Sequence, residues 1–190
     1  MKSIMGLVRP RGGRITFDSH RIDDRQPHEI ARFGLGYVPE DRRIFTDLSV
    51  MENLEVGRQA PRAGAPSWTP ERLFELFPNL AEMRNRPGGR MSGGEQQMLT
   101  IARTLMGNPR LLLLDEPSEG LAPVIVEQMA STIGALKSQG LTVLLSEQNL
   151  HFSNLVADRA YIIEKGRIRY EGTMNALAAD PAIREAYLSV

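Results

Sequence analysis

Residues Met91–Pro117 read M-S-G-G-E-Q-Q-M-L-T-I-A-R-T-L-M-G-N-P-R-L-L-L-L-D-E-P, and this stretch decides the fold. Ser92 and Glu95 have the spacing of a capping box, in which both side chains bind backbone N–H groups at the start of a helix. Gly93 and Gly94 carry no Cβ, so a ligand can approach the backbone closely there. Because a helix N-terminus favours anions, the stretch predicts a helix start that binds phosphate.

A short apolar strand and two acidic residues follow this helix. The helical spacing of apolar residues ends at Gly107-Asn108-Pro109. Leu111–Leu114 is an unbroken apolar run, which suits a strand buried on both faces of a parallel sheet. Asp115 and Glu116 come next, and Pro117 favours an extended backbone at Glu116. Both acids are therefore expected at the carboxyl edge of the sheet, where open α/β folds bind their ligands.

The composition is that of an ordinary globular domain. The chain has 190 residues, of which 42% are apolar, and this is enough for one domain with a substantial core. Basic and acidic residues number 23 each, so net charge favours neither nucleic acid nor an anionic surface. There is no cysteine, which excludes disulfides, thiolate metal sites and cysteine nucleophiles. No apolar run approaches the roughly 18–20 residues of a membrane span.

Strand and helix patterns alternate along the rest of the chain, which predicts an α/β fold with a parallel sheet. Lys2–Val8 is expected to be the end of a helix, with Gly6 as its capping glycine. Further helices are expected at Pro27–Phe33, at Val50–Val56 after a second capping box (Ser49 and Glu52), from Pro70 to a stop at Pro78, and from Pro123 to a stop at Gly140. The last two expected helices are about Asn149–Ala157 and Thr173–Leu188, the latter with a new piece that begins at Pro181. The expected strands are Gly13–Ile22 with its turn, Gly34–Pro39, a buried strand at Leu141–Leu145, Ala160–Ile163 and Ile168–Tyr170.

The glycine-started helix followed by the acid-tipped strand resembles the ABC-type ATPase family, with its signature loop, connecting helix and Walker B strand. The resemblance covers essentially the whole chain. It implies one ABC ATPase domain, incomplete at its N-terminus, with a P-loop NTPase-like parallel sheet core (residues 1–45 and 108–190), a helical signature subdomain (about 46–107) and a small antiparallel β portion.

The resemblance also implies roles for individual residues. Similar ATPases pair head to tail, so that each ATP lies between two subunits and the signature loop of one faces the γ-phosphate held by the other. The residues that would bind phosphate in this way are Ser92, Gly93 and Gly94, with Glu95 and Gln96 in support. Asp115 would hold Mg²⁺, and Glu116 would be the general base that polarises the attacking water. The loop that would link the two sites across the dimer is Ser118, Glu119, Gly120 and Leu121.

Two positions depart from the general family pattern. Glu40 stands where the loop usually offers glutamine to Mg²⁺ and water, and Gln148 stands where a switch histidine is usual. Glu40 in V-P-E-D-R-R-I-F and Gln148 in L-L-S-E-Q-N resemble the second ATP-binding subunit of branched-chain amino-acid importers. S-E-G-L-A-P (118–123) and R-E-A-Y-L (184–188) are similar to that subgroup too. The related urea importers share these motifs, so the sequence leaves both substrates open.

No G-x-x-x-x-G-K-[ST] phosphate-binding loop is present, since none of the three lysines follows a glycine. The resemblance therefore leads us to expect an N-terminally truncated domain. We expect these residues alone to be marginally folded, because apolar surface is left exposed, and to lack ATPase activity.

The partners implied by the resemblance are a second ATPase subunit and transmembrane permease subunits, with no nucleic acid. Ile44 and Phe45 are apolar residues beside Glu40, and we expect the permease to dock there. The location implied is peripheral, at the cytoplasmic face of the inner membrane. Two alternatives stay open: a soluble ABC ATPase of DNA repair or translation, and a regulatory half-site without catalysis.

Overall fold

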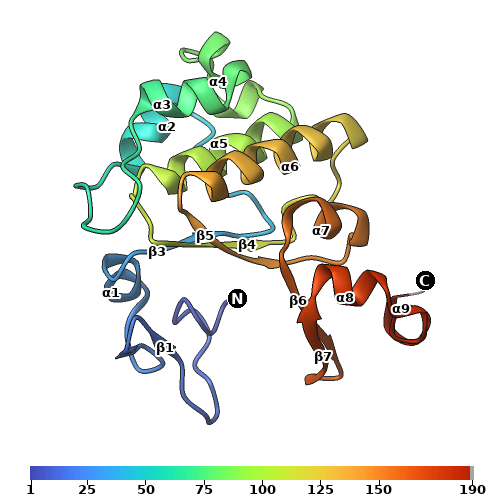
Figure 1. Cartoon of the computed structure of the whole chain (residues 1–190). Coiled ribbons are helices and arrows are strands. Elements are labelled where there is room, and N and C mark those ends of the chain that lie inside the picture. Colours follow the sequence, from blue (N-terminus) through green and yellow to red (C-terminus); the bar gives the residue numbers. More distant parts are fainter. Residues whose placement is uncertain (189–190) are drawn as a thin grey trace. The chain divides into compact units, whose positions relative to one another are not determined.

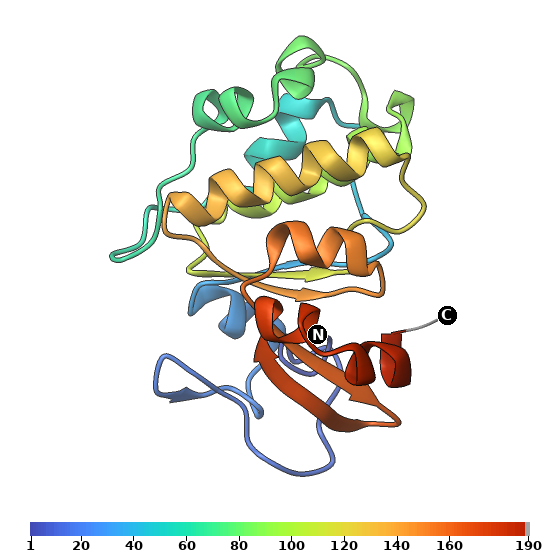
Figure 2. The same cartoon turned by 45° about the vertical axis from the view of Figure 1, so that its right-hand side comes forward.

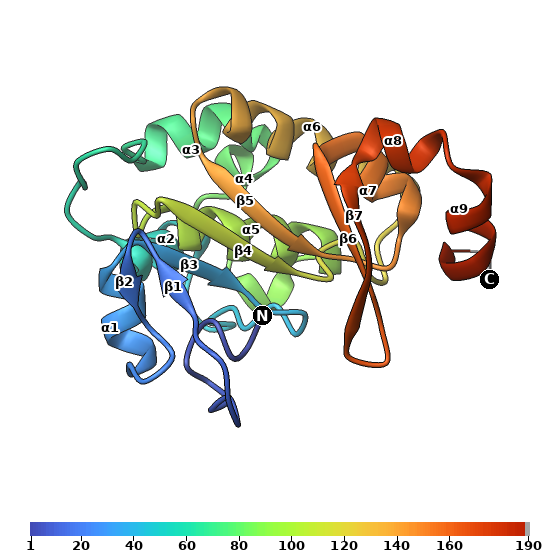
Figure 3. The ribbon, with the colours of Figure 1, turned by 60° about the horizontal axis from the view of Figure 1, so that its bottom comes forward.

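Three parallel strands form the sheet of the first of two units in the computed structural model, which describes residues 1–188 (Figure 1). This unit is Met1–Ser146. Strand β4 (Leu111–Asp115) lies between β3 (Leu35–Val38) and β5 (Thr142–Ser146), and both neighbours run parallel to it. Figure 3 shows the three strands side by side. The predicted α/β class and the parallel core are therefore confirmed.

The two faces of the sheet pack against different parts of the chain. Alternate side chains of a strand point to opposite faces. On one face, Leu35 and Leu113 join a buried cluster with Met5, Ile22 and Ile30. On the other face, a methyl group added at Gly36 would lie 2.8 Å from the Thr104 side chain of helix α5 (Gly93–Leu105), so this glycine allows the helix to approach the sheet closely. Helix α6 (Pro123–Ser138) runs beside α5 in both Figure 1 and Figure 2.

The N-terminal segment contains turns rather than regular elements. Met1–Val8 forms hydrogen-bonded turns and no assigned helix, which corrects the expected helix end. Gly6 is nevertheless a helix-type cap: its φ is +69°, its N–H donates to Ser3, and the next N–H, of Leu7, donates to Lys2. These two bonds make a Schellman motif, which a single turn suffices to build.

The expected strand and turn at Gly13–Ile22 is a much smaller hairpin. Strands β1 (Thr16–Phe17) and β2 (His20–Arg21) pair antiparallel. The linking residues Asp18 and Ser19 have φ values of +48° and +65°, the positive pair that a type I′ hairpin turn requires. Helix α1 (Pro27–Arg32) follows as predicted.

A layer of helices lies beyond α5, on the side away from the sheet (Figure 1). It consists of α2 (Val50–Gly57), α3 (Pro70–Leu76), α4 (Pro78–Glu82) and the short 3₁₀ turn η1 (Gly88–Arg90). The predicted capping box of α2 is present: Ser49 Oγ accepts from the Glu52 N–H, and Glu52 Oε2 accepts from the Ser49 N–H. Helix α3 ends before Pro78 as expected, but Pro78 also begins α4, because proline suits the first position of a helix.

The second unit runs from Glu147 to the end of the described residues. It contains helix α7 (Leu150–Val156), the antiparallel strands β6 (Arg159–Glu164) and β7 (Arg167–Thr173), and helices α8 (Met174–Ala178) and α9 (Pro181–Leu188). These are the elements predicted there, including the small antiparallel portion. Lys165 and Gly166 form the hairpin turn with φ values of +50° and +75°.

Strand β5 is less buried than the sequence predicts. Thr142 is exposed, and 40% of the Leu144 side chain is accessible to solvent. Among the described residues β5 pairs with β4 alone, so it lies at an edge of the sheet, and the apolar pattern by itself does not reveal this. Within residues 1–188, no helix combines the length and apolar character that a membrane crossing requires.

Candidate functional site

The predicted phosphate-binding helix start is formed by α5. Ser92 Oγ accepts from the Glu95 N–H at 3.4 Å, and Glu95 Oε2 accepts from the Ser92 N–H at 2.7 Å. The capping box is therefore confirmed. The Gln96 side chain donates to the carbonyls of Gly88 and Met91 at 3.1 and 3.2 Å, so it fixes the turn that leads into the helix.

Arg42 places a positive charge beside this helix start. A methyl group added at Gly93 would lie 2.6 Å from one of its guanidinium nitrogens, so the absence of a side chain at Gly93 makes room for Arg42. A methyl group added at Gly120 would lie 4.0 Å from another guanidinium nitrogen. Arg42 thus lies between the signature loop and the predicted dimer loop. A cation and the positive end of the α5 dipole act together on any anion bound there.

The two acids lie at the carboxyl end of β4, as predicted. Asp115 is half-buried, and its Oδ2 accepts a hydrogen bond of 2.9 Å from the Tyr37 hydroxyl on β3. Burial, together with this bond to a carboxylate, raises the pKa of Tyr37 to about 12, because both disfavour the phenolate.

The backbone of Glu116 differs from the prediction. Its φ is +47°, in the left-handed region, and not in the extended region that Pro117 was expected to favour. Two hydrogen bonds fix this geometry: the Glu116 N–H donates to the Ser146 carbonyl at 2.9 Å, and its own carbonyl accepts from the Glu119 N–H at 3.2 Å. Non-glycine residues in this region cost energy and are concentrated at functional sites. The turn therefore outweighs the preference of the residue before proline.

The expected dimer loop is the turn that follows. Ser118 is 5% exposed, whereas Glu119 and Gly120 are exposed. The Leu121 N–H donates to the Ser118 carbonyl at 3.3 Å, and Gly120 has a φ of +64°, which favours glycine. The two exposed residues are thus presented at the tip of a hydrogen-bonded turn.

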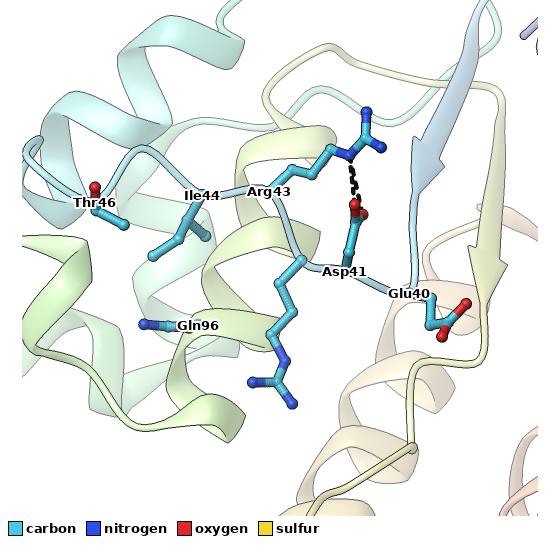
Figure 4. A pocket seen from close by; sticks show the side chains of 7 residues that line it. Glu40, Asp41, Arg43, Ile44, Thr46 and Gln96 are labelled. Atoms are coloured by element: carbon cyan, nitrogen blue, oxygen red, sulfur yellow. Dashed lines mark hydrogen bonds and ion pairs between the residues drawn. The ribbon is translucent and has the colours of Figure 1, made fainter.

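Glu40 begins a loop that lines a hollow of about 320 Å³. Figure 4 shows Ile44 and Thr46 on one side of it with Gln96 of α5, while the Arg43 side chain turns back onto Asp41. That ion pair measures 2.8 Å, and the backbones of Arg42 and Arg43 are both left-handed, with φ values of +61° and +47°. Glu40 itself is exposed at the end of β3. The hollow therefore adjoins both the expected metal-facing acid and the signature helix.

The two expected docking residues of this loop differ in exposure. Phe45 is 47% exposed. Ile44 is half-buried, and its Cδ1 would lie 2.9 Å from a methyl group added at Gly88. Phe45 is therefore the one that offers apolar surface to a partner.

Gln148 belongs to the second unit, so its predicted contact with a γ-phosphate stays a prediction. Within the described residues, no group of three or more histidines, cysteines or acids is placed to hold a metal by itself. Mg²⁺ at nucleotide sites usually takes one or two carboxylates and completes its shell with phosphates and water. Asp115 and Glu40, each at the carboxyl end of a neighbouring strand, fit that pattern.

The sequence did not point to several contacts within the site, nor to the side chains that hold the neighbouring Glu40–Phe45 loop. Arg42 beside Gly93, Tyr37 on Asp115, and the set formed by Asn53, Thr100 and Arg103 around the Glu40–Phe45 loop are all contacts between distant parts of the chain. The local signals are an asparagine within the apolar pattern of α2 (Asn53) and an arginine near the end of α5 (Arg103), and neither indicates which residue it contacts.

The comparisons with known proteins agree with this geometry. The family model described as ABC transporter matches residues 1–119. The chain belongs to the ABC transporter family. The high-affinity branched-chain amino acid transport ATP-binding protein BraG of Pseudomonas aeruginosa is 42% identical over 99% of this chain and 81% of its own length. The lipopolysaccharide export system ATP-binding protein LptB of Haemophilus influenzae is 35% identical over 97% of this chain and 78% of its own.

Solved structures of the ABC family have the same fold. An ATP-binding cassette of an ABC transporter in its ADP conformation superimposes with a TM-score of 0.78 and 26% identity, over all of this chain and 82% of the other. The expected ABC ATPase fold and the resemblance to branched-chain amino-acid transport ATPases are therefore confirmed. Nucleotide binding and association with transmembrane permease components are general properties of the ABC family.

Proposed function

We propose that this chain is an ATP-hydrolysing subunit of an importer that takes up branched-chain amino acids. The observation that carries the proposal is the pairing of the Arg42-flanked helix start at Gly93 with the acids that end β4. The first group suits the phosphates of a nucleotide, and the second suits its metal and the attacking water.

Each half of this site would act on a different subunit's nucleotide. Ser92, Gly93 and Gly94 would donate backbone and hydroxyl hydrogen bonds to the γ-phosphate of ATP held by a second ATPase subunit. Arg42, on the same side of the loop, adds a cation to that contact. Charge-assisted bonds of this kind are about twice as strong as neutral ones.

The acids would serve the chemistry of hydrolysis. Asp115, oriented by Tyr37, and Glu40 would hold Mg²⁺, which neutralises phosphate charge when it is bound. Glu116 would accept a proton from the attacking water. The left-handed backbone of Glu116 fixes the position of its Cα, and so the point from which its side chain extends, at the edge of the sheet. Gln148 would add a neutral hydrogen bond to the γ-phosphate, because an amide carries no charge.

The amino-acid substrate rests on similarity to BraG over almost the whole chain. The test is uptake of labelled leucine into vesicles that contain the transmembrane partners and this ATPase. ATP enclosed in the vesicles, on the side of the membrane that carries the ATPase, should drive accumulation of leucine, and Glu116→Gln should abolish this accumulation. The matched control is Glu75→Gln, an exposed glutamate on α3 outside the site, which should behave like the unchanged protein. Uptake of urea but not leucine would reassign the substrate within importers.

A second candidate function is export of lipopolysaccharide, which the similarity to LptB favours. The transmembrane partner would decide between the two, since the ATPase supplies the same chemistry to either. Stable co-purification with an export permease, and none with an importer permease, would overturn the first proposal.

We further propose that residues 1–190 alone do not turn over ATP, because they contain no lysine-bearing phosphate loop. They would supply the signature half of a site to an intact partner. Phosphate release by the purified 190-residue chain should not exceed that of the same chain carrying Glu116→Gln. Rapid release that Glu116→Gln removes would contradict this.

A further inference from the structure

Arg103 lies near the end of α5 and reaches across to the Glu40–Phe45 loop. Its Nη2 donates to the Arg43 carbonyl at 2.6 Å, and its Nη1 lies 3.4 Å from Asn53 Oδ1. Its guanidinium also stacks over the Phe45 ring, 5.0 Å from the ring centroid. Burial lowers the pKa of Arg103 from its ordinary value, yet a guanidinium stays charged at neutral pH.

Asn53 and Thr100 hold the same loop by its backbone. Asn53 is fully buried on α2; its Oδ1 accepts from the Phe45 N–H and its Nδ2 donates to the Phe45 carbonyl, both at 3.0 Å. Thr100 on α5 donates to the Arg42 carbonyl at 2.7 Å. Side chains of two helices therefore satisfy the backbone of three loop residues, two of which have left-handed φ values.

The close approach of α2 to α5 brings these side chains together. A methyl group added at Gly57, the last residue of α2, would overlap the backbone carbonyl of Arg103. Only a residue without a Cβ allows the two helices to approach so closely. The packing of Gly57 against the Arg103 backbone therefore fixes the position from which the Arg103 side chain extends to the loop.

The N-terminal end of α5 thus carries the signature glycines, and Arg103 near its C-terminal end binds the loop that exposes Phe45. The separation of Gly93 and Arg103 along the helix is about 15 Å at 1.5 Å per residue. Phe45 is 47% exposed and is also the apolar residue expected to meet a transmembrane partner. A rigid element that contacts both places is the kind of physical connection that coupling between sites requires.

We propose that Arg103 is a positioning residue that fixes the Phe45 surface to the signature helix, so that a movement of α5 on ATP binding is passed to the transmembrane partner. This rests on the proposed transport function. Arg103 touches no nucleotide-binding or catalytic residue named above; it acts through the Arg43 carbonyl, Asn53 and the Phe45 ring.

The first test follows the loop itself by amide hydrogen exchange on the purified protein, and it needs no transport. Arg103→Ala should raise exchange of residues 42–48 about tenfold, the equivalent of one lost hydrogen bond to a charged group. Residues 98–102 of α5 should keep their protection. Unchanged exchange of the loop would overturn the proposal, and so would equal loss of protection throughout α5.

The second test uses the assembled transporter in vesicles and separates hydrolysis from transport. Arg103→Ala should lower substrate transported per ATP by about five- to tenfold, while phosphate release stays within about twofold, a coupling of typical size. Arg103→Lys, which keeps the charge near the ring but loses the fork, should restore part of the ratio. A proportional fall of both rates would mean a merely structural role and would overturn the proposal.

A double-mutant cycle with Phe45→Leu tests the pair. If Arg103 acts through the ring, the double variant should be no worse than Arg103→Ala alone, whereas additive losses would contradict the assignment. The matched control is Arg84→Ala, because Arg84 stacks over Phe74 at 5.2 Å in the same way but lies outside the loop. If the unchanged transporter moves no substrate, the proposed function fails, while the exchange experiment still decides the role of Arg103.

Discussion

The Tyr37 hydroxyl donates a hydrogen bond of 2.9 Å to Asp115 Oδ2, from one strand of the parallel sheet to the carboxyl end of the next. The bond orients the carboxylate that we assign to Mg²⁺. It also ties the end of β3, where the Glu40 loop starts, to the end of β4, which Glu116, the proposed catalytic acid, follows.

Tyr37→Phe tests this bond through the pH dependence of stability. The folded-state pKa of Tyr37, about 12, lies above its ordinary value of 10.0. Its contribution to stability is therefore complete below pH 10 and is lost as the pH rises through 12. Unfolding by urea between pH 9 and pH 12 should show a steeper fall for the unchanged protein than for Tyr37→Phe. Parallel curves would mean that neither burial nor this bond raises the pKa of Tyr37 in the folded protein.

Glu116→Gln should lower ATP turnover of the assembled transporter by about 10²–10⁴-fold, because a positioned general base contributes that much. Nucleotide binding should persist, since the amide keeps the shape of the side chain. Phosphate release and binding of a fluorescent ATP analogue measure the two separately. Turnover near that of Glu75→Gln would remove Glu116 from the chemistry.

Gly57→Ala should lower the free energy of unfolding by about 1–3 kcal/mol, the cost of forcing atoms into a packed contact. The added methyl group meets the Arg103 backbone, which cannot move aside as a flexible side chain can. Gly134→Ala on α6 is the matched control, because nothing lies within 4 Å of its added methyl group. That change should stabilise the helix by about 0.5–1 kcal/mol. Thermal unfolding of both variants gives the comparison, and equal stabilities would contradict the close approach of α2 and α5.

Phe45→Asp should abolish transport in the assembled complex while phosphate release continues, because a charge then replaces the apolar surface offered to the partner. Val56→Asp is a suitable control, since Val56 is 53% exposed on α2 outside the loop and should leave transport intact. Ile44→Asp is a poorer probe because Ile44 packs against Gly88. Normal transport by Phe45→Asp would move the docking surface elsewhere.

Local patterns in the sequence predicted the elements well. The capping boxes at Ser49 and Ser92, the apolar run of β4 and the proline at the start of α6 each act within one or two turns of chain. Such signals are visible in the sequence because their partners are close along it. The acids after β4 could be placed for the same reason, since a parallel strand fixes which edge its last residues reach.

The errors and omissions have a different origin. The apolar run of β5 could not reveal that the strand lies at an edge, and Pro117 could not reveal that two hydrogen bonds hold Glu116 in a left-handed turn. The contacts of Arg42 with Gly93 and of Arg103 with Phe45 join residues about 50 or more positions apart, and a single sequence records no pairing of that kind.

Helix α5 has 13 residues and is about 20 Å long. A tilt of the helix by about 10° about its first turn would displace its last turn by about 3 Å. This displacement is several times the variation in donor–acceptor distance that a hydrogen bond tolerates. The bonds from Thr100 and Arg103 to the loop would break under such a displacement unless the loop moved with the helix. A modest tilt at the phosphate end would therefore become a shift of ångström size at the aromatic ring of Phe45.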